Sequence, residues 1–179
     1  MRILMILIPE NGGPGSNHDP SVRFERAAVA YYAFRDAGVE VVLASPEGGS
    51  PLLEAVGREE ASITIANRFK RDKRAIDEFS DTLSLDQVFA DDFDAAFCVG
   101  LPGSIWRADH ESSAGTLVSK LLEAGKPVVV LPSGIDLAPK GAGEGLLIIG
   151  DGAKAPSSAA VALMDAIRQY QIKPERNAS

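Results

Sequence analysis

The sequence has few of the side chains on which most enzyme chemistry depends. Its 179 residues include a single cysteine, Cys98, which excludes an intrachain disulfide framework and a cysteine-rich zinc site. It has two histidines, His18 and His110, so few imidazoles are available as bases or metal ligands. Neither histidine stands in a spacing typical of a metal site. The sequence therefore predicts no metal and no cofactor.

Positive charge and long apolar runs are also scarce. Lys and Arg number 18 against 25 Asp and Glu, which gives a net charge of −7. This balance argues against nucleic acid or an anionic membrane as the main partner. No apolar run approaches the ~20 residues of a membrane-spanning helix, and the first residues lack the pattern of a signal peptide. We expect a cytoplasmic protein.

The composition is that of an ordinary globular chain, with 45% hydrophobic and 24% charged residues. At about 150 residues per domain the length predicts one domain, which we place at residues 1–172, with a frayed tail at 173–179. Short apolar runs bounded by Gly and Pro alternate with helical patterns. That alternation is typical of βαβ units and an α/β fold with a parallel sheet.

The pattern also predicts where the elements lie. Predicted strands cover residues 2–8, 40–44, 95–99, 127–131 and 146–149. Predicted helices cover residues 22–37, 71–79, 113–124 and 158–170. We expect Asp19 and Ser21 to cap the first helix and Gly38 and Gly125 to end two of the helices. Residues 50–82 are otherwise weakly patterned.

Four strings of the sequence stand out together: residues 37–49 read AGVEVVLASPEGG, 83–103 read LSLDQVFADDFDAAFCVGLPG, 123–130 read EAGKPVVV, and 156–162 read PSSAAVA. In their order and spacing they resemble the DJ-1/PfpI superfamily (class I glutamine amidotransferase-like), and its Hsp31-like branch above all. The resemblance covers most of the chain. It implies a flavodoxin-like three-layer sandwich with a mainly parallel sheet, a site at the carboxyl ends of the strands, and a dimer.

The resemblance also implies a nucleophilic cysteine, followed by a histidine, on a strained turn after a strand. Residues 126–134 read KPVVVLPSG, so Pro132 stands at the cysteine position, Ser133 at the histidine position, and Gly134 keeps its place. Proline carries no nucleophile, and its ring fixes φ near −65°, whereas such a turn usually needs a strained backbone. The sequence therefore predicts that the cysteine chemistry has been lost.

Other parts of the implied site depart as well. The helix position of the family's acid holds Arg26, and Glu25 lies one residue away, which is about 100° around a helix. The connection over residues 134–145 is short, so residues that would cover the site are missing. The pocket that the resemblance implies would be lined by Glu25, Arg26, Gly100, Leu101, Pro102, Gly103, Trp106, Pro132 and Ser133.

We therefore expect a catalytically degenerate protein, a pseudoenzyme that acts as a binding, regulatory or subunit module. The resemblance implies a homodimer or a pairing with a related chain, and a small-molecule ligand. One alternative is a glyoxalase-, deglycase- or hydrolase-like enzyme whose site uses Ser133 or Glu25. Another is a holdase chaperone.

Three further features of the sequence each allow a functional interpretation and a simpler structural one. Cys98 could be a displaced nucleophile, but its apolar surroundings in AAFCV favour a buried, inert thiol. His18 lies in the loop NGGPGSNHD, which could cradle an anion, although a surface loop is the simpler interpretation. Residues 68–74, RFKRDKR, could bind an anionic partner, but we expect a solvated face.

Overall fold

The structure is a computed structural model, and it describes residues 1–10, 20–55, 60–100, 113–131, 147–149 and 155–172. Within these residues the main sheet has six strands in the order β5-β3-β1-β6-β7-β8, and every pair is parallel. The strands are β1 (Arg2–Leu7), β3 (Glu40–Ser45), β5 (Leu83–Ser84), β6 (Ala95–Val99), β7 (Val128–Leu131) and β8 (Leu147–Ile149). The predicted α/β class is confirmed.

Both faces of the central strands are buried, which is why they read as continuous apolar runs. In β1, Ile3 and Met5 belong to the core on one face of the sheet, and Leu4 and Ile6 belong to the core on the other. β6 and β7 contain only buried residues. This alternation of side chains holds the sheet between two hydrophobic layers.

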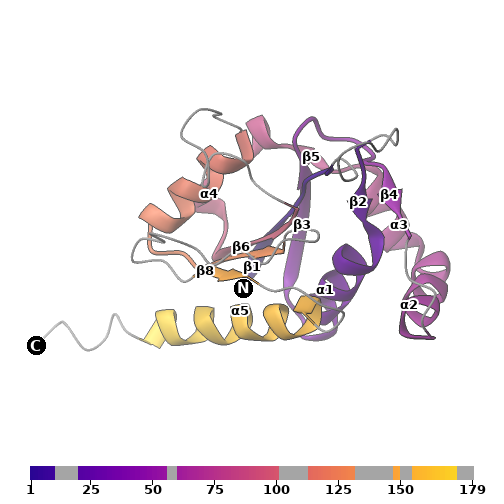
Figure 1. The fold of residues 1–179 in the computed structure, drawn as a ribbon. Helices are drawn as coiled ribbons and strands as arrows, with labels where there is room; N and C mark the ends of the chain where they lie inside the picture. Colours follow the sequence, from indigo (N-terminus) through magenta and orange to yellow (C-terminus); the bar gives the residue numbers. More distant parts are fainter. Residues whose placement is uncertain (11–19, 56–59, 101–112, 132–146, 150–154, 173–179) are drawn as a thin grey trace, which may run out of the picture.

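Helices form the two outer layers (Figure 1). α1 (Phe24–Asp36) and α5 (Ala155–Ile172) cover one face of the sheet, and α4 (Ser113–Glu123) covers the other. Two short 3₁₀ turns, η1 (Leu85–Gln87) and η2 (Ala90–Asp92), pack beside α4. The predicted three-layer flavodoxin-like sandwich is confirmed.

The segment between β3 and β6 contains more structure than the sequence predicts. It holds β4 (Leu53–Glu54), α2 (Glu60–Arg71) and α3 (Lys73–Ser80), where the pattern predicted one short helix over residues 71–79. α2 escaped prediction because none of its residues is fully buried. It lies outside α1, and the Phe69 ring meets the Phe24 ring edge-on at a centroid distance of 5.1 Å.

The start of the first helix also differs from the prediction. Val22 and Arg23 form β2 (Val22–Arg23), a short strand parallel to β4, so α1 begins only at Phe24. Ser21 does not cap the helix: its hydroxyl donates to Glu54 Oε2 over 2.8 Å, and its backbone pairs with Glu10. Asp19 lies outside the described residues. The Gly38 prediction is confirmed, since Gly38 follows the helix with a φ of 73°.

The remaining predictions of helix boundaries agree with the structure in part. Gly125 follows α4 with a φ of 70°, as expected. α5 begins at Ala155, three residues before the predicted start. Residues 173–179, for which we predict a frayed tail, lie outside the described part of the chain. No helix in the described ranges is long and apolar enough to cross a membrane.

Candidate functional site

The carboxyl ends of three adjacent strands meet at one edge of the sheet. The Ile8 amide donates to the Val99 carbonyl over 2.9 Å, and the Gly100 amide donates to the Leu131 carbonyl over 2.8 Å. The chain passes from β1 to β3 on one side and then to β6 on the other, so the topology switches between β1 and β6. In open α/β sheets, ligands bind beyond the carboxyl ends of the strands at such a switch point.

Gly100 occupies this edge because no other residue fits. Its φ is 100°, a conformation that side chains disfavour. A Cβ atom added at Gly100 would lie 2.4 Å from the Ile8 carbonyl oxygen, well inside van der Waals contact. The glycine therefore lets the chain leave β6 close to the end of β1. Leu101, Pro102, Gly103 and Trp106, predicted to line the pocket beyond it, lie outside the described residues.

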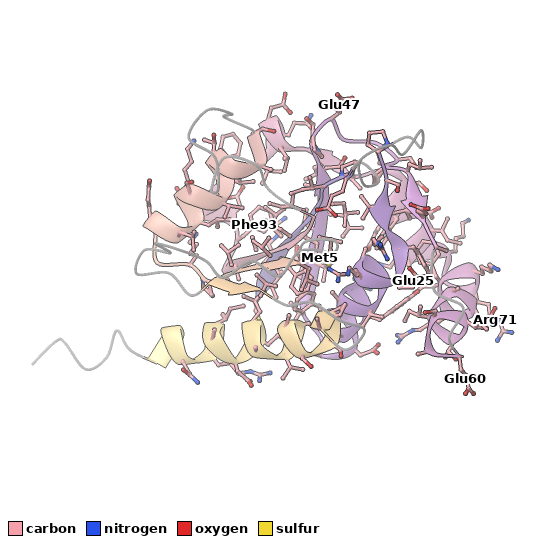
Figure 2. All side chains as sticks on the ribbon, in the orientation of Figure 1. Met5, Glu25, Glu47, Glu60, Arg71 and Phe93 are labelled. Carbon is pink, nitrogen blue, oxygen red and sulfur yellow. The ribbon has the colours of Figure 1, made fainter. Side chains whose placement is uncertain are left out.

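Glu25 and Arg26 lie in the first turn of α1, and both side chains are half-buried. Figure 2 labels Glu25 at this turn. The antiparallel bridge between Glu10 and Ser21 and the pairing of β2 with β4 hold the start of the helix. A carboxylate in the first helical turn is favourable because it faces the positive end of the helix dipole. The structure thus places Glu25 and Arg26 in the first turn of one helix, and that they line a pocket stays a prediction.

Comparison with known proteins identifies the fold of this chain. No family model matches the chain, and no curated protein matches it. Among solved structures, the chain is similar to the rapid encystment protein of 24 kDa from Francisella tularensis, with 11% identity, a TM-score of 0.68, and coverage of 93% of this chain and 98% of that one. It is similar to glyoxalase III from Candida albicans, with 12% identity, a TM-score of 0.62, and coverage of 92% and 96%.

A ThiJ/PfpI domain protein from Brachyspira murdochii has a TM-score of 0.57 and 14% identity, with coverage of 94% of this chain and 96% of that one. The chain has the DJ-1/ThiJ/PfpI fold. At these identities the likeness concerns the fold alone, and the resemblance predicted from the sequence is confirmed at that level. These three matches span nearly the whole of both chains.

The residue directly after β7 is the most important one for the proposed chemistry, because the resemblance to the DJ-1/PfpI superfamily places the nucleophile at that position. β7 ends at Leu131, so the next residue in the chain is Pro132. Pro132, Ser133 and Gly134 lie outside the described residues, as does the connection over 134–145. That Pro132 occupies the position of a nucleophile stays a prediction.

Cys98, the only cysteine of the chain, lies inside the sheet of the DJ-1/PfpI fold. It is paired with Ile6 on β1 and Val130 on β7, and its exposed fraction is 0%. Burial away from water raises the pKa of its thiol to about 12. The reactive form of cysteine is the thiolate, so this side chain is a small core residue. The prediction of a buried thiol is confirmed.

Acidic and histidine side chains do not gather into a metal site in the described ranges: no group of three or more His, Cys, Asp or Glu residues could hold an ion there. His18 and His110 lie outside those ranges.

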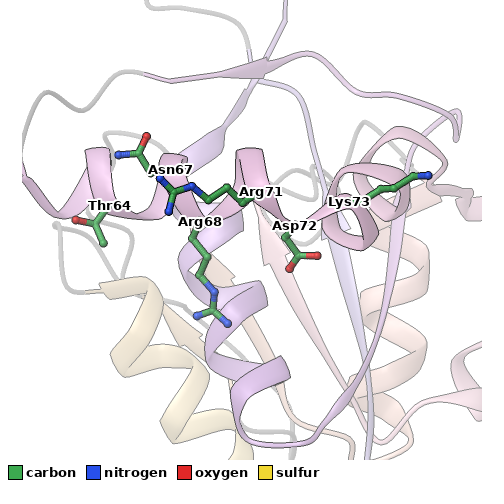
Figure 3. Close-up of a pocket in the computed structure, with 6 residues that line it drawn as sticks. All are labelled: Thr64, Asn67, Arg68, Arg71, Asp72 and Lys73. Atoms are coloured by element: carbon green, nitrogen blue, oxygen red, sulfur yellow. The ribbon is translucent and has the colours of Figure 1, made fainter.

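A different kind of site lies at the basic segment 68–74 that the sequence analysis singled out. The residues that line a groove there are Thr64, Asn67, Arg68, Arg71, Asp72 and Lys73 (Figure 3).

The sequence contained a signal for this groove. Thr64, Asn67, Arg68 and Arg71 follow the spacing i, i+3, i+4 and i+7, which places them on one face of a helix. The sequence analysis did not predict this groove, because it did not predict α2. The solvated face expected for residues 68–74 is present only in part, since Arg68 and Arg74 form ion pairs with Asp36 and Glu78.

Proposed function

We propose that this protein keeps the DJ-1/PfpI scaffold without its cysteine chemistry, and that it acts by binding, as a regulatory module or as a subunit. The observation that carries this proposal is the position of Cys98. The chain has no second cysteine, and the one that it has is fully buried in the middle of the sheet. A thiol that substrate cannot reach cannot serve as its nucleophile.

The sequence at the strand edge supports the same proposal. Proline follows β7 directly, where the resemblance implies a cysteine, and Arg26 stands where it implies an acid. The close approach of Gly100 to Ile8 at the ends of β6 and β1 supports a binding site at this edge. A scaffold that retains the crevice edge and lacks the reacting group is suited to binding. The homodimer or related partner chain and the cytoplasmic location stay predictions.

Methylglyoxal consumption by the purified protein tests the proposal, because one structure with this fold is that of a glyoxalase III. The parent and the variants Cys98→Ser, Ser133→Ala and Glu25→Gln are assayed side by side. We expect no turnover above buffer in any of them. Turnover in the parent that one substitution abolishes would overturn the proposal, and it would identify the residue that replaces the missing thiol.

Circular dichroism of each variant provides the control for folding. Cys98→Ser places a hydroxyl in an apolar core and is expected to lower stability, so loss of activity in that variant counts only if its spectrum matches the parent. Glu25→Gln keeps the size of the side chain while it removes the charge. Activity lost in Glu25→Gln alone would therefore point to an acid-dependent reaction.

A further inference from the structure

The groove on α2 and α3 combines a helix face with the turn that follows it. Thr64, Asn67, Arg68 and Arg71 come from α2, while Asp72 and Lys73 come from the junction with α3. The space between them is about 680 Å³ and open to solvent. Pockets for small molecules fall in the range of about 300–1,000 Å³. The groove is thus large enough for a metabolite and too shallow to enclose one completely.

Arg68 is fixed as one wall of this groove. Its Nη1 and Nη2 donate to the two carboxylate oxygens of Asp36 over 2.8 Å and 2.5 Å. Its Cζ lies 3.8 Å from the centre of the Tyr32 ring, so the guanidinium also stacks on α1. Figure 3 shows Arg68 reaching from α2 toward α1. Its charge is neutralised by Asp36, and it holds the wall in place.

Arg71 and Lys73 are exposed cations without a charged partner among the described residues. In the described part of the chain neither side chain takes part in a hydrogen bond or an ion pair, and the Asn67 amide makes no hydrogen bond there either. Figure 2 shows Arg71 on the outer side of the molecule. On a chain with a net charge of −7, two cations beside a groove that make no stabilising contact with the described residues are candidates for binding an anion.

Asp72 forms no ion pair with these cations in the described residues, and two neutral groups donate to its carboxylate. One oxygen accepts from the Ala75 amide over 3.1 Å and caps α3, and the other accepts from the Tyr32 hydroxyl over 3.2 Å. Arg71 and Lys73 together carry more positive charge than Asp72 carries negative charge. The groove therefore offers a net positive charge and three uncommitted donor groups, on Asn67, Arg71 and Lys73.

We infer that this groove binds a small molecule that carries a phosphate group. A guanidinium presents two parallel N–H donors that match phosphate oxygens, and an ammonium adds a compact positive charge. The Asn67 amide can donate to the same group or to a neighbouring oxygen. A long polyanion fits less well, because a net charge of −7 repels it outside the groove. This inference concerns a different surface from the strand edge and stands apart from the proposed function.

Calorimetric titration with inorganic pyrophosphate at low ionic strength tests the inference. The key variant is Arg71→Ala/Lys73→Ala. The matched control is Lys120→Ala/Arg168→Ala, which removes the same charge from exposed positions on α4 and α5. We expect one site in the parent, with a Kd raised at least about tenfold in the key variant and changed less than about twofold in the control.

Two outcomes would overturn the inference. The parent could show no saturable binding up to roughly 10 mM pyrophosphate, a Kd too weak for a specific site. Alternatively, the control could lose as much affinity as the key variant, which would mean that only diffuse charge attracts the ion. Asn67→Asp provides a second variant that leaves both cations intact. It places a carboxylate in the groove and is expected to weaken binding as well.

Discussion

Gly100 shows how one residue shapes the edge where the candidate site lies. Its backbone amide joins β6 to β7 through the Leu131 carbonyl, while its Cα faces the Ile8 carbonyl of the chain leaving β1. The φ of 100° and this close approach both require the absence of a side chain. The sequence predicted this glycine as part of a pocket through the family resemblance. The contact with Ile8 depends on sheet packing, which no local pattern encodes.

Replacing Gly100 tests that role. We expect Gly100→Ala to lower the free energy of unfolding by about 2–4 kcal/mol, since the new Cβ meets backbone that cannot move aside. Gly38→Ala is the matched control: Gly38 also has a positive φ, but nothing lies within 4 Å of its added Cβ. That variant should lose only about 1 kcal/mol, from backbone strain. Urea unfolding measures both losses, and equal losses would contradict the account.

At the scale of elements, α1 holds the α2–α3 segment through two tyrosines. The Tyr31 hydroxyl donates to Glu78 Oε2 over 2.7 Å, and the Tyr32 hydroxyl donates to Asp72 Oδ2 over 3.2 Å. Burial, and next the charge of Asp72, raise the pKa of Tyr32 to about 12, and burial raises the pKa of Tyr31 further still. Both hydroxyls therefore stay protonated in the fold at a pH where free tyrosine, with a pKa of about 10, loses its proton.

This difference makes stability depend on alkaline pH. Above a pH of about 10 the unfolded chain releases tyrosine protons that the folded chain keeps, so the free energy of unfolding falls as pH rises. Cys98 acts in the same direction, with a folded pKa of about 12. We expect Tyr32→Phe to make the decline between about pH 10 and 12 shallower, because one group no longer titrates. Urea unfolding at pH 7, 9, 10 and 11 measures the slopes.

The same variant has a second expected effect at neutral pH. Loss of the hydrogen bond to Asp72 should cost about 1 kcal/mol at pH 7. A parent and a Tyr32→Phe variant with the same pH dependence would contradict the raised pKa of Tyr32. Cys98→Ala is a useful comparison, since it removes a titrating group from the sheet and leaves the contacts between α1 and α3 intact.

Elements differ in how well the sequence predicts them. β6 and β7 lie in the middle of the sheet, so every residue in them is apolar and the pattern predicts them closely. α2 touches the core through half-buried side chains such as Ile65 and Phe69, and its remaining residues face outward. Besides the ring contact of Phe69 with Phe24, α2 is tied to α1 by the ion pair of Arg68 with Asp36. Ion pairs between residues distant in sequence leave no local signal.

At the scale of the whole molecule, the DJ-1/PfpI fold is present, and we propose that its cysteine chemistry is not. Short apolar runs predicted the α/β class, and the family resemblance supplied the three-layer arrangement, which packing alone determines. The loss of the cysteine chemistry was predicted from several departures together: Pro132 at the nucleophile position, Arg26 at the position of the acid, the short connection over 134–145, and the loop over 100–103. The position of Cys98 between β1 and β7, with no exposed surface, supports the same proposal independently.

The most direct test is whether the thiol of Cys98 can be reached in the native protein. Iodoacetamide is added to the folded protein, and the rate of alkylation is measured by intact mass spectrometry. The chain has one thiol, so each labelled molecule gains one adduct. We predict negligible labelling of the folded protein at neutral pH and complete labelling in urea, because only opening of the sheet exposes Cys98. Rapid labelling of the native protein, with the pH profile of an accessible thiolate, would contradict it.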